Sequence, residues 1–557
     1  MRRFIFLFAI ASVLAAIAPA CNCAGGATFS CRIDKDCPSN EVCLNGMCVV
    51  GQRVDGGVKL PDGGVYHYDA GPVYDSGIHL LPDGGIPCTG LACNIDPCPG
   101  VDGGTTLTGT VMDPSGQLPL YDVFVYVPNG TVQPFPQGVS CGPCGASVSG
   151  FPVAITLTDS HGNFTLNNVP TNPAGTIPLV LQIGKWRRVT AVTSPTACMS
   201  TPVPTSVTRM PTMHDNTGND IPHIALSTGS LDQLECLFHK MSLDGEVSAG
   251  PGSGRINLYQ TNPGNPGATS VNGSNMPNGT SLYDNLSTLE QYDVVMLPCE
   301  GSPNAKTPQE EKNMVDYTND GGRMFATHYG YEWIGTNYGA QPFPTTADWS
   351  VEDSAAPMDG IGVTINTGFA KGQAFHDWLA NLPIPGTGLT NNEFLVHQAR
   401  YDVAKVNATA PSYVSPTSAW MFGNSNADWS SSPTYNWTPH LTFDTPFGLD
   451  AGIGEGSGPV QCGRVVYSDF HVSNPSGGDY PSECAAPTFS AQEAALVFML
   501  FDLSACVNGG GTQPICAGVN GSCSQNSDCC AGLSCLTPVS LEPCNGASGC
   551  ACLTAIQ

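Results

Sequence analysis

Alternating apolar and polar residues dominate the chain from Thr105 to residue 221. TLTGTVMDPSGQLPLYDVFVYVP and ITLTDSHGNFTLNNVP alternate around turns at Pro-Ser-Gly and His-Gly, and IPLVLQIGKWRRVTAV is a more apolar pair of strands. A period of two with regularly spaced turn signals is typical of antiparallel sheets packed face to face. The pattern therefore predicts a β-sandwich over residues 105–221.

From residue 222 to 506 short apolar runs alternate with helical periodicity. The predicted strands lie in HIALSTGS, YDVVMLPCEG, RMFATHYG and CGRVVYSDFHVSN. The predicted helices lie in LDQLECLFHKM after a Thr-Gly-Ser cap, in TPQEEKNMVDYTND with Pro308 in its first turn, and in AQEAALVFMLFDLS after Ser490 as cap. Strands and helices in alternation predict an α/β region with a doubly wound parallel sheet. A Trp- and Asn-rich stretch, residues 335–457, reads as an insertion in it.

The N-terminus has the composition of an export signal. Met1-Arg2-Arg3 is followed by the apolar FIFLFAIASVLAAIA, and small residues precede Cys21. A cysteine directly after the cleavage point is typical of bacterial lipoproteins, in which it carries the acyl chains. We expect residues 1–20 to be removed and Cys21 to anchor the protein at the outer membrane or cell surface. Simple secretion, with Cys21 in a disulfide, is the alternative.

Charge and cysteine content narrow the class of protein. Among 557 residues, 19 Lys and Arg face 46 Asp and Glu, a net charge of −27. So acidic a chain repels phosphate backbones, which argues against nucleic-acid partners. Apart from Cys21, the 25 cysteines leave an even number, which fits disulfides in an oxidising compartment. Repeated DGG, DAG and DSG units over residues 51–104 predict a flexible acidic linker.

Two small cysteine-rich modules flank the chain. Residues 21–50 contain Cys31, Cys37, Cys43 and Cys48 without a C-x2-C pair or a histidine, so disulfides are expected there rather than zinc. Residues 507–557 contain CAGVNGSCSQNSDCCAGLSC, a spacing that resembles an inhibitor cystine knot. That resemblance implies the pairs Cys516–Cys530 and Cys523–Cys535, and Cys529 with a later cysteine.

The predicted sandwich resembles a known accessory module. Gly109-Thr110-Val111, Asp113 to Gly116, Val123 to Val127 and Thr158 to Phe164 resemble the carboxypeptidase regulatory-like family, a transthyretin-like fold. The resemblance implies an accessory, non-catalytic role. An insertion carries Cys141 and Cys144 as CGPC in a Gly/Pro loop, where structural bridges are favoured over a redox pair, with Cys198 as one available partner.

The α/β region resembles the class I glutamine-amidotransferase-like superfamily, and within it the ThuA-like proteins. The motifs are GGRMFATHYG and GRVVYSDFH, and the resemblance covers residues 222–334 and 458–506. In amidotransferases the first turn supplies a nucleophilic Cys and a late strand supplies its His base. Carried over, His328 falls in the nucleophile region and His471 on the base. Because histidine cannot perform that acyl chemistry, the resemblance implies a degenerate domain.

Several polar residues are expected at one edge of this sheet. Cys299-Glu300, His328 and Asp469 to His471 follow predicted strands, and Glu332 lies four residues after His328. Two His and two carboxylates would form a divalent-metal or acid–base cluster, with His328, His471 and Glu332 as the catalytic residues. A hydrogen-bonded remnant of a dead enzyme, in which the histidines pair with Glu332 and Asp469, is favoured over such a cluster. A divalent metal at this crevice is the one cofactor considered.

The remaining cysteines and the tryptophans allow competing interpretations. Cys299 is either a nucleophile beside His328 or, as favoured for an exported protein, a disulfide partner of Cys236. Cys462 and Cys484 are expected to form a local disulfide. The insertion's tryptophans form either a glycan-binding face or a core, and core is favoured for most of them; they are Trp349, Trp378, Trp420, Trp429 and Trp437.

Taken together, these patterns predict an exported, lipid-anchored cell-surface protein with a binding or adhesion role. Its partners would be the membrane, through the anchor, and a glycan or a surface protein. One alternative is a hydrolase or metal-dependent enzyme that uses the crevice around His328 and His471. A structural component of the envelope is the other alternative.

Overall fold

The computed structural model describes residues 88–554 with gaps, and upstream of them five short strands. The gaps are residues 142–147, 216, 262–266, 336–339, 350–358, 383, 385–388, 390–392, 408–416, 426–434, 448–460, 473–476, 485–486, 506, 508–514, 539–542 and 545–548. The chain divides into two compact units, Met1–Leu80 and Leu81–Gln557. The expected signal segment with Cys21, and also Cys31, Cys37 and Trp429, lie outside the described residues.

The first unit contains a hairpin and a small three-stranded sheet. β1 (Glu41–Leu44) pairs with β2 (Met47–Val50), and Cys43 lies directly across from Cys48 in that register. β3 (Gln52–Val54), β4 (Gly57–Lys59) and β5 (Val65–His67) form the second sheet. These strands lie within the predicted cysteine-rich module and the first part of the predicted linker.

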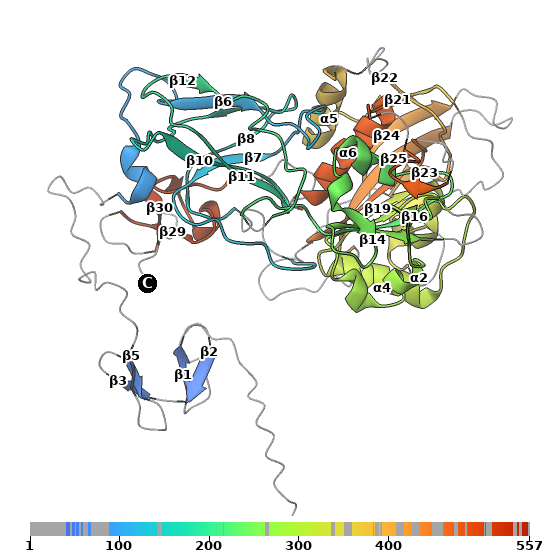
Figure 1. Cartoon of the computed structure of the whole chain (residues 1–557), viewed down its shortest axis with the longest axis horizontal. Helices are drawn as coiled ribbons and strands as arrows, with labels where there is room; N and C mark the ends of the chain where they lie inside the picture. The colour runs from blue at the N-terminus through green and yellow to red at the C-terminus, as the bar shows by residue number, and fades with distance from the viewer. Residues whose placement is uncertain are drawn as a thin grey trace, which may run out of the picture. The chain divides into compact units, whose positions relative to one another are not determined.

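Two sheets fold from the stretch in which alternation predicted a sandwich (Figure 1). The first has the order β11-β10-β7-β8 and the second the order β12-β6-β9. The strands are β6 (Thr106–Thr110), β7 (Phe124–Pro128), β8 (Pro152–Leu157), β9 (Asn163–Leu166), β10 (Thr176–Ile183), β11 (Trp186–Thr193) and β12 (Ser200–Pro202). Leu107 and Phe164 of one sheet share a core with Val125 and Leu179 of the other. The two sheets therefore bury their apolar faces together.

A ten-stranded sheet dominates the remainder, in the order β14-β15-β13-β18-β19-β26-β25-β24-β21-β22. Its first six strands run parallel: β13 (Ile224–Thr228), β14 (Val247–Ala249), β15 (Ile256–Gln260), β18 (Val294–Leu297), β19 (Arg323–Thr327) and β26 (Gly463–Ser468). The other four pair antiparallel: β21 (Ile361–Ile365), β22 (Glu393–Val396), β24 (Ser418–Ser425) and β25 (Tyr435–Thr445). The predicted insertion thus extends the same sheet.

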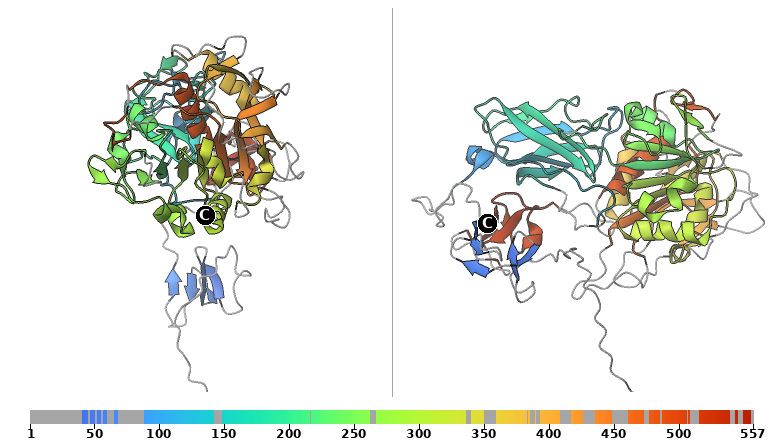
Figure 2. Two further views of the ribbon diagram at one scale, coloured as in Figure 1. Left: turned by 90° about the vertical axis from the view of Figure 1, so that its right-hand side faces the viewer. Right: turned by 60° about the horizontal axis from the view of Figure 1, so that its bottom comes forward.

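Successive residues of the parallel strands enter two different cores. Val294, Met296 and Phe325 pack with α1 (Glu235–Lys240) and α6 (Ala491–Ser504), whereas Val295 and Met324 pack with α4 (Pro308–Asn319). In Figure 1, α4 and α2 (Thr280–Tyr283) lie below these strands and α6 above them, and Figure 2 gives two further views. The other helices are α3 (Leu286–Leu289) and α5 (Ala370–Ala380).

The helix caps follow the sequence signals in two cases and depart from them in one. α4 begins with a capping box from Thr307, with Pro308 at its first position, and Ser490 caps α6 in the same way. The predicted Thr-Gly-Ser cap before α1 is wrong, because α1 begins only at Glu235. Ser230 instead donates its hydroxyl to the carbonyl of Glu300 at 2.7 Å, which holds this stretch over the sheet edge. No helix among the described residues is both long enough and apolar enough to cross a bilayer.

Disulfides join distant parts of the second unit. They pair Cys88–Cys93, Cys98–Cys198, Cys141–Cys462 and Cys236–Cys484. The expected pairs Cys462–Cys484 and Cys236–Cys299 are wrong. Cys462 lies before β26, at the amino end of the parallel strands. Cys236 lies beyond their carboxyl end. A six-residue strand is about 20 Å long, so the two cysteines lie at opposite ends of the sheet. Cys484 therefore reaches Cys236, and Cys299 is left as a buried free thiol.

The C-terminal tail is a small disulfide-linked sheet that packs on the sandwich. It contains β28 (Ser522–Cys523), β29 (Leu533–Leu536) and β30 (Cys550–Thr554). Its bridges are Cys516–Cys530, Cys523–Cys535, Cys529–Cys552 and Cys544–Cys550, and the first three match what the resemblance implied, with Cys552 as the later cysteine that pairs with Cys529. The buried cysteines share a core with Phe124 and Tyr126 of β7.

Candidate metal centre

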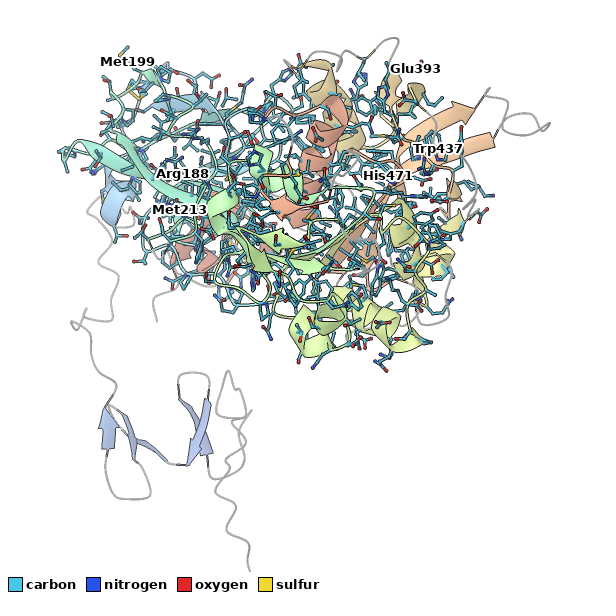
Figure 3. All side chains as sticks on the ribbon, turned by 45° about the vertical axis from the view of Figure 1, so that its right-hand side comes forward. Arg188, Met199, Met213, Glu393, Trp437 and His471 are labelled. Carbon is cyan, nitrogen blue, oxygen red and sulfur yellow. A yellow bond between two sulfur atoms is a disulfide. The ribbon has the colours of Figure 1, made fainter. Side chains whose placement is uncertain are left out.

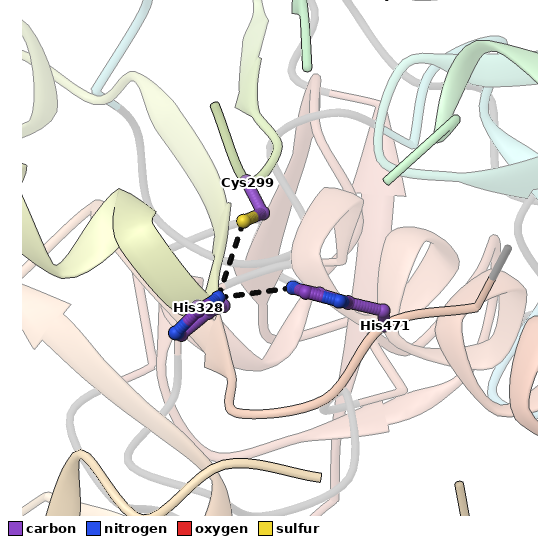
Figure 4. A group of neighbouring side chains, drawn as sticks. All are labelled: Cys299, His328 and His471. Carbon is purple, nitrogen blue, oxygen red and sulfur yellow. Dashed lines mark hydrogen bonds between the residues drawn. The ribbon is translucent and has the colours of Figure 1, made fainter. Parts of the chain in front are cut away.

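Three side chains meet at the carboxyl ends of adjacent parallel strands. Cys299 follows β18, His328 follows β19, and His471 follows β26. Because these three strands are neighbours in the sheet, the loops that leave them lie side by side. Figure 4 shows Cys299 and His471 both pointing toward His328.

The three groups form a compact, buried cluster. Nδ1 of His328 lies 3.2 Å from Sγ of Cys299 and 3.0 Å from Nε2 of His471 (Figure 4). One sulfur and two nitrogen atoms all lie within 4.8 Å of one another. The side chains are almost inaccessible, with exposures of 0% for Cys299, 3% for His328 and 2% for His471. The cluster is therefore an enclosed N/S donor set.

The backbone turns sharply at His328. Its φ is +36°, in the left-handed region that side-chain-bearing residues rarely adopt. The carbonyl of His328 accepts a hydrogen bond from the Tyr467 hydroxyl at 2.9 Å, and the short helix η4 (His328–Trp333) starts at once. Gly330 keeps this turn close to the sheet, because a Cβ there would lie 2.9 Å from the Leu297 carbonyl. Such strain of about 1–3 kcal/mol persists where surrounding contacts enforce it.

Burial sets the protonation of all three groups. Desolvation raises the pKa of the Cys299 thiol to about 12. Desolvation, followed by the neighbouring His471 and Arg400, lowers the pKa of His328 to about 2. Desolvation and then Arg400 lower the pKa of His471 to about 3. At neutral pH the cluster thus holds a thiol and two neutral imidazoles, whose lone pairs are available to a metal.

Asp232 ties the strand ends together. Its carboxylate accepts hydrogen bonds from the Thr327 hydroxyl at 2.9 Å and from the backbone N–H of Val472 at 3.0 Å. Thr327 in turn accepts the backbone N–H of Cys299 at 3.0 Å. The three loops that carry the cluster are therefore held by one buried network, and Asp232 positions the ligands without joining them.

A carboxylate from the insertion faces the other nitrogen of His328. Oδ2 of Asp402 lies 3.7 Å from Nε2 of His328 and accepts the Tyr467 hydroxyl at 3.2 Å. Asp469 holds that segment in place, because it accepts the backbone N–H of Asp402 at 2.7 Å and the Trp437 indole N–H at 3.2 Å. A carboxylate behind a histidine orients the ring of many metal ligands. Sequence reasoning missed Asp402, since no local motif marks it.

Two predicted members of the site lie outside the cluster. Glu300 binds the Lys306 ammonium and the Asn304 amide, each at 2.7 Å. Glu332 is buried on η4, and among the described residues the group within 4.8 Å contains neither of these glutamates. The predicted four-residue cluster is therefore corrected to Cys299, His328 and His471. The carboxylate of Asp469 accepts hydrogen bonds from the backbone of Asp402 and from Trp437. The predicted pairing of Asp469 with His471 is therefore not what the structure shows.

The insertion's tryptophans are mostly core. Trp378, Trp420 and Trp437 are each 1% exposed, and Trp349 packs edge-on against Tyr467. Buried rings cannot stack on a sugar, so these three offer no glycan-binding face.

The donor set fits a soft or borderline transition metal. In a tetrahedral zinc site, bonds of about 2.0–2.3 Å place the ligand atoms about 3.3–3.6 Å apart. The separations of 3.2 and 3.0 Å from Nδ1 of His328 need only a small expansion to admit the ion, and the third ligand pair, Cys299 and His471, lies within 4.8 Å. The positive charge of the nearby Arg400 opposes the binding of a cation. The negative charge of an ionised Cys299 thiolate would offset the charge of Arg400.

Comparison with known proteins adds little to this picture. No family model and no curated protein matches the chain. A solved putative ThuA-like protein from Bacteroides uniformis ATCC 8492 is 10% identical, with 50% of this chain and 88% of that chain covered and a TM-score of 0.26. Another, from Parabacteroides merdae ATCC 43184, is 9% identical, with 59% and 96% covered and a TM-score of 0.27. Likeness at this level supports no conclusion about the site.

Proposed function

We propose that the chain is an exported metal-binding protein of the cell surface. Its region 222–506 would be a doubly wound, amidotransferase-like domain in which a Cys-His-His centre replaces the nucleophile. The observation that carries the proposal is the convergence of Cys299, His328 and His471 from three adjacent parallel strands. Helices that share cores with both faces of the parallel strands support the doubly wound fold.

The protonation states favour metal binding over acyl chemistry. A thiol needs a base to become a nucleophile, and the pKa of Cys299 is about 12 whereas that of His328 is about 2. Proton transfer between them is strongly unfavourable, so the pair does not form an activated thiolate. A bound metal ion ionises a coordinating thiol directly. Cys299, His328 and His471 would hold the ion, and Asp402 would orient His328.

Binding is favoured over catalysis because the three ligands are enclosed. Three protein ligands leave a fourth position for water, as in catalytic zinc sites. A substrate must reach that position, and the three side chains are at most 3% exposed. We infer that the metal stabilises the strand ends, and that the protein acts at the surface by binding. Anchoring through Cys21 would hold it there.

Metal analysis of the purified residues 21–557 tests this function. We expect one zinc or cobalt ion per chain, and for cobalt a thiolate charge-transfer band with intense tetrahedral d–d bands. His328→Ala, His471→Ala and Cys299→Ser should each abolish binding or weaken it at least tenfold. His397→Ala, which removes a 53% exposed imidazole paired with Asp359, is the matched control. A wild-type protein that is folded and binds no metal, or a His328→Ala variant that keeps full stoichiometry, would refute the proposal.

Lipid anchoring needs its own experiment. Cells that express the full chain are fed an alkyne-labelled palmitate, and the protein is recovered from the membrane fraction. We expect label in the wild type and none in Cys21→Ser. Equal labelling of both proteins, or none in either, would remove the anchor from the proposal.

A further inference from the structure

A cavity lies where the connection out of the sandwich runs along the edge strand β11. The N–H of Val189 donates to the carbonyl of Gly218 at 3.1 Å, and Arg187 and Asp220 exchange backbone hydrogen bonds, so residues 218–220 follow this strand. The cavity has a volume of about 210 Å³ and is remote in sequence from the Cys-His-His centre. Figure 3 shows two of its lining residues, Arg188 and Met213, close together. Arg209, Pro211 and Asp215 also line it.

Two arginines in this cavity have no carboxylate partner among the residues that the structure describes. The adjacent Arg187, by contrast, forms a salt bridge, with Nη2 lying 2.7 Å from Oδ2 of Asp220. Neither Arg188 nor Arg209 has a carboxylate oxygen within 4.0 Å in the part of the chain that the structure describes. Nη1 of Arg188 donates to the carbonyl of Arg209 at 2.8 Å, so the two residues are neighbours. Burial and then the charge of Arg209 lower the pKa of Arg188, which shows that the two cations repel each other.

Asp215 lines the cavity but does not neutralise the arginines. Its carboxylate accepts hydrogen bonds from the backbone and side chain of Thr217, both at 2.7 Å, and from those of Asn219 at 3.1 and 2.6 Å. Burial opposes its ionisation, but these bonds prevail and keep its pKa below the usual range. Asp215 therefore stays negative and would disfavour a ligand with several negative charges.

We propose that this cavity binds a small organic monocarboxylate. Its carboxylate would pair with Arg188 and Arg209, since guanidinium groups match carboxylate oxygens in geometry and charge. Its short hydrocarbon part would lie against Pro211 and Met213, whose side chain is 61% exposed beside the arginines. The volume is below the usual range for drug-sized ligands, so a chain of a few carbons fits.

Calorimetric titration of residues 21–557 at low ionic strength tests the site with butyrate. We expect saturable binding of one butyrate per chain, with a Kd on the order of 1 mM. The neutral butyramide should not bind, and inorganic phosphate should bind at least tenfold more weakly than butyrate. Added salt should weaken the butyrate complex, because the pairing is ionic. No saturable butyrate binding, or phosphate binding as tight as butyrate, would overturn the proposal.

Variants separate the site from general charge effects. Arg188→Gln and Arg209→Gln should each weaken butyrate at least tenfold, whereas Lys405→Gln, which removes an exposed cation elsewhere, should change it less than twofold. Met213→Glu places a carboxylate beside the arginines and should abolish binding in a protein that stays folded. Unchanged butyrate binding in Met213→Glu or in either arginine variant would exclude this cavity. None of these measurements depends on a bound metal. Refutation of the metal-binding proposal can therefore be distinguished from refutation of the carboxylate-binding proposal.

Discussion

Replacing Cys141 and Cys462 by alanine should destabilise the ten-stranded sheet and loosen the metal centre. The bridge spans a sequence separation of 321 residues and anchors the start of β26. In the unfolded chain, the bridges Cys98–Cys198 and Cys236–Cys484 shorten the loop that Cys141–Cys462 closes to about 103 residues. A loop of that length corresponds to about 5 kcal/mol of lost unfolding free energy.

The same bridge controls the segment that carries His471. Residues 462–484 are tied at their start to Cys141 and at their end to Cys236. Without the first tie, β26 keeps its pairing with β19, but its start at Gly463 frays more easily, and this loosening reaches His471 only through the strand. We therefore expect metal binding to weaken by about tenfold rather than to disappear.

Urea denaturation followed by tryptophan fluorescence measures the loss. Trp420 and Trp437 are buried on β24 and β25 and report on this sheet. Cys88→Ala with Cys93→Ala is the control, since its loop of 5 residues predicts a loss of only about 2 kcal/mol. If the two double variants lose the same stability, or the Cys141 variant loses less than about 2 kcal/mol, the loop-entropy reasoning is wrong.

Three further variants test individual groups. His328→Gly should bind no metal yet be about 1 kcal/mol more stable in urea than His328→Ala, because glycine accepts the φ of +36° without strain; equal stabilities would contradict this. Burial, then the charge of Glu483, raises the pKa of Glu235, and that of Glu483 itself is raised to about 7, mainly by burial. Because these carboxyl pKa values are raised in the folded state, the free energy of unfolding falls as pH rises from about 4.5 toward 8. Glu235→Gln should flatten this fall and be about 1 kcal/mol more stable than the wild type at pH 8. Parallel pH profiles of the two proteins would refute the raised pKa of Glu235. Lys240→Ala leaves the buried Glu493, 2.7 Å away, unpaired and should cost about 3 kcal/mol of unfolding free energy; a loss below about 1 kcal/mol would show that the pair behaves as an exposed one.

Local patterns were enough to place many of the elements. Alternation located strands such as β6 and β9, and apolar runs located β18, β19 and β26. Pro308 and Ser490 marked the starts of α4 and α6. These features follow from residues close together in the chain, because periodicity and capping are short-range properties. The position of His328 and His471 after buried strands could be predicted for the same reason.

Contacts between distant segments were decided only by the tertiary structure. The order of the strands placed Cys299 beside His328 rather than beside Cys236, and sent Cys484 to Cys236. The insertion joined the sheet and brought Asp402 behind the centre, which no spacing in the sequence indicates. Pairings of this kind depend on which strand ends are neighbours, and strand order is set by packing of the whole domain rather than by local composition. The sequence by itself therefore determined which residues lie at the sheet edge, and the fold determined which of them meet.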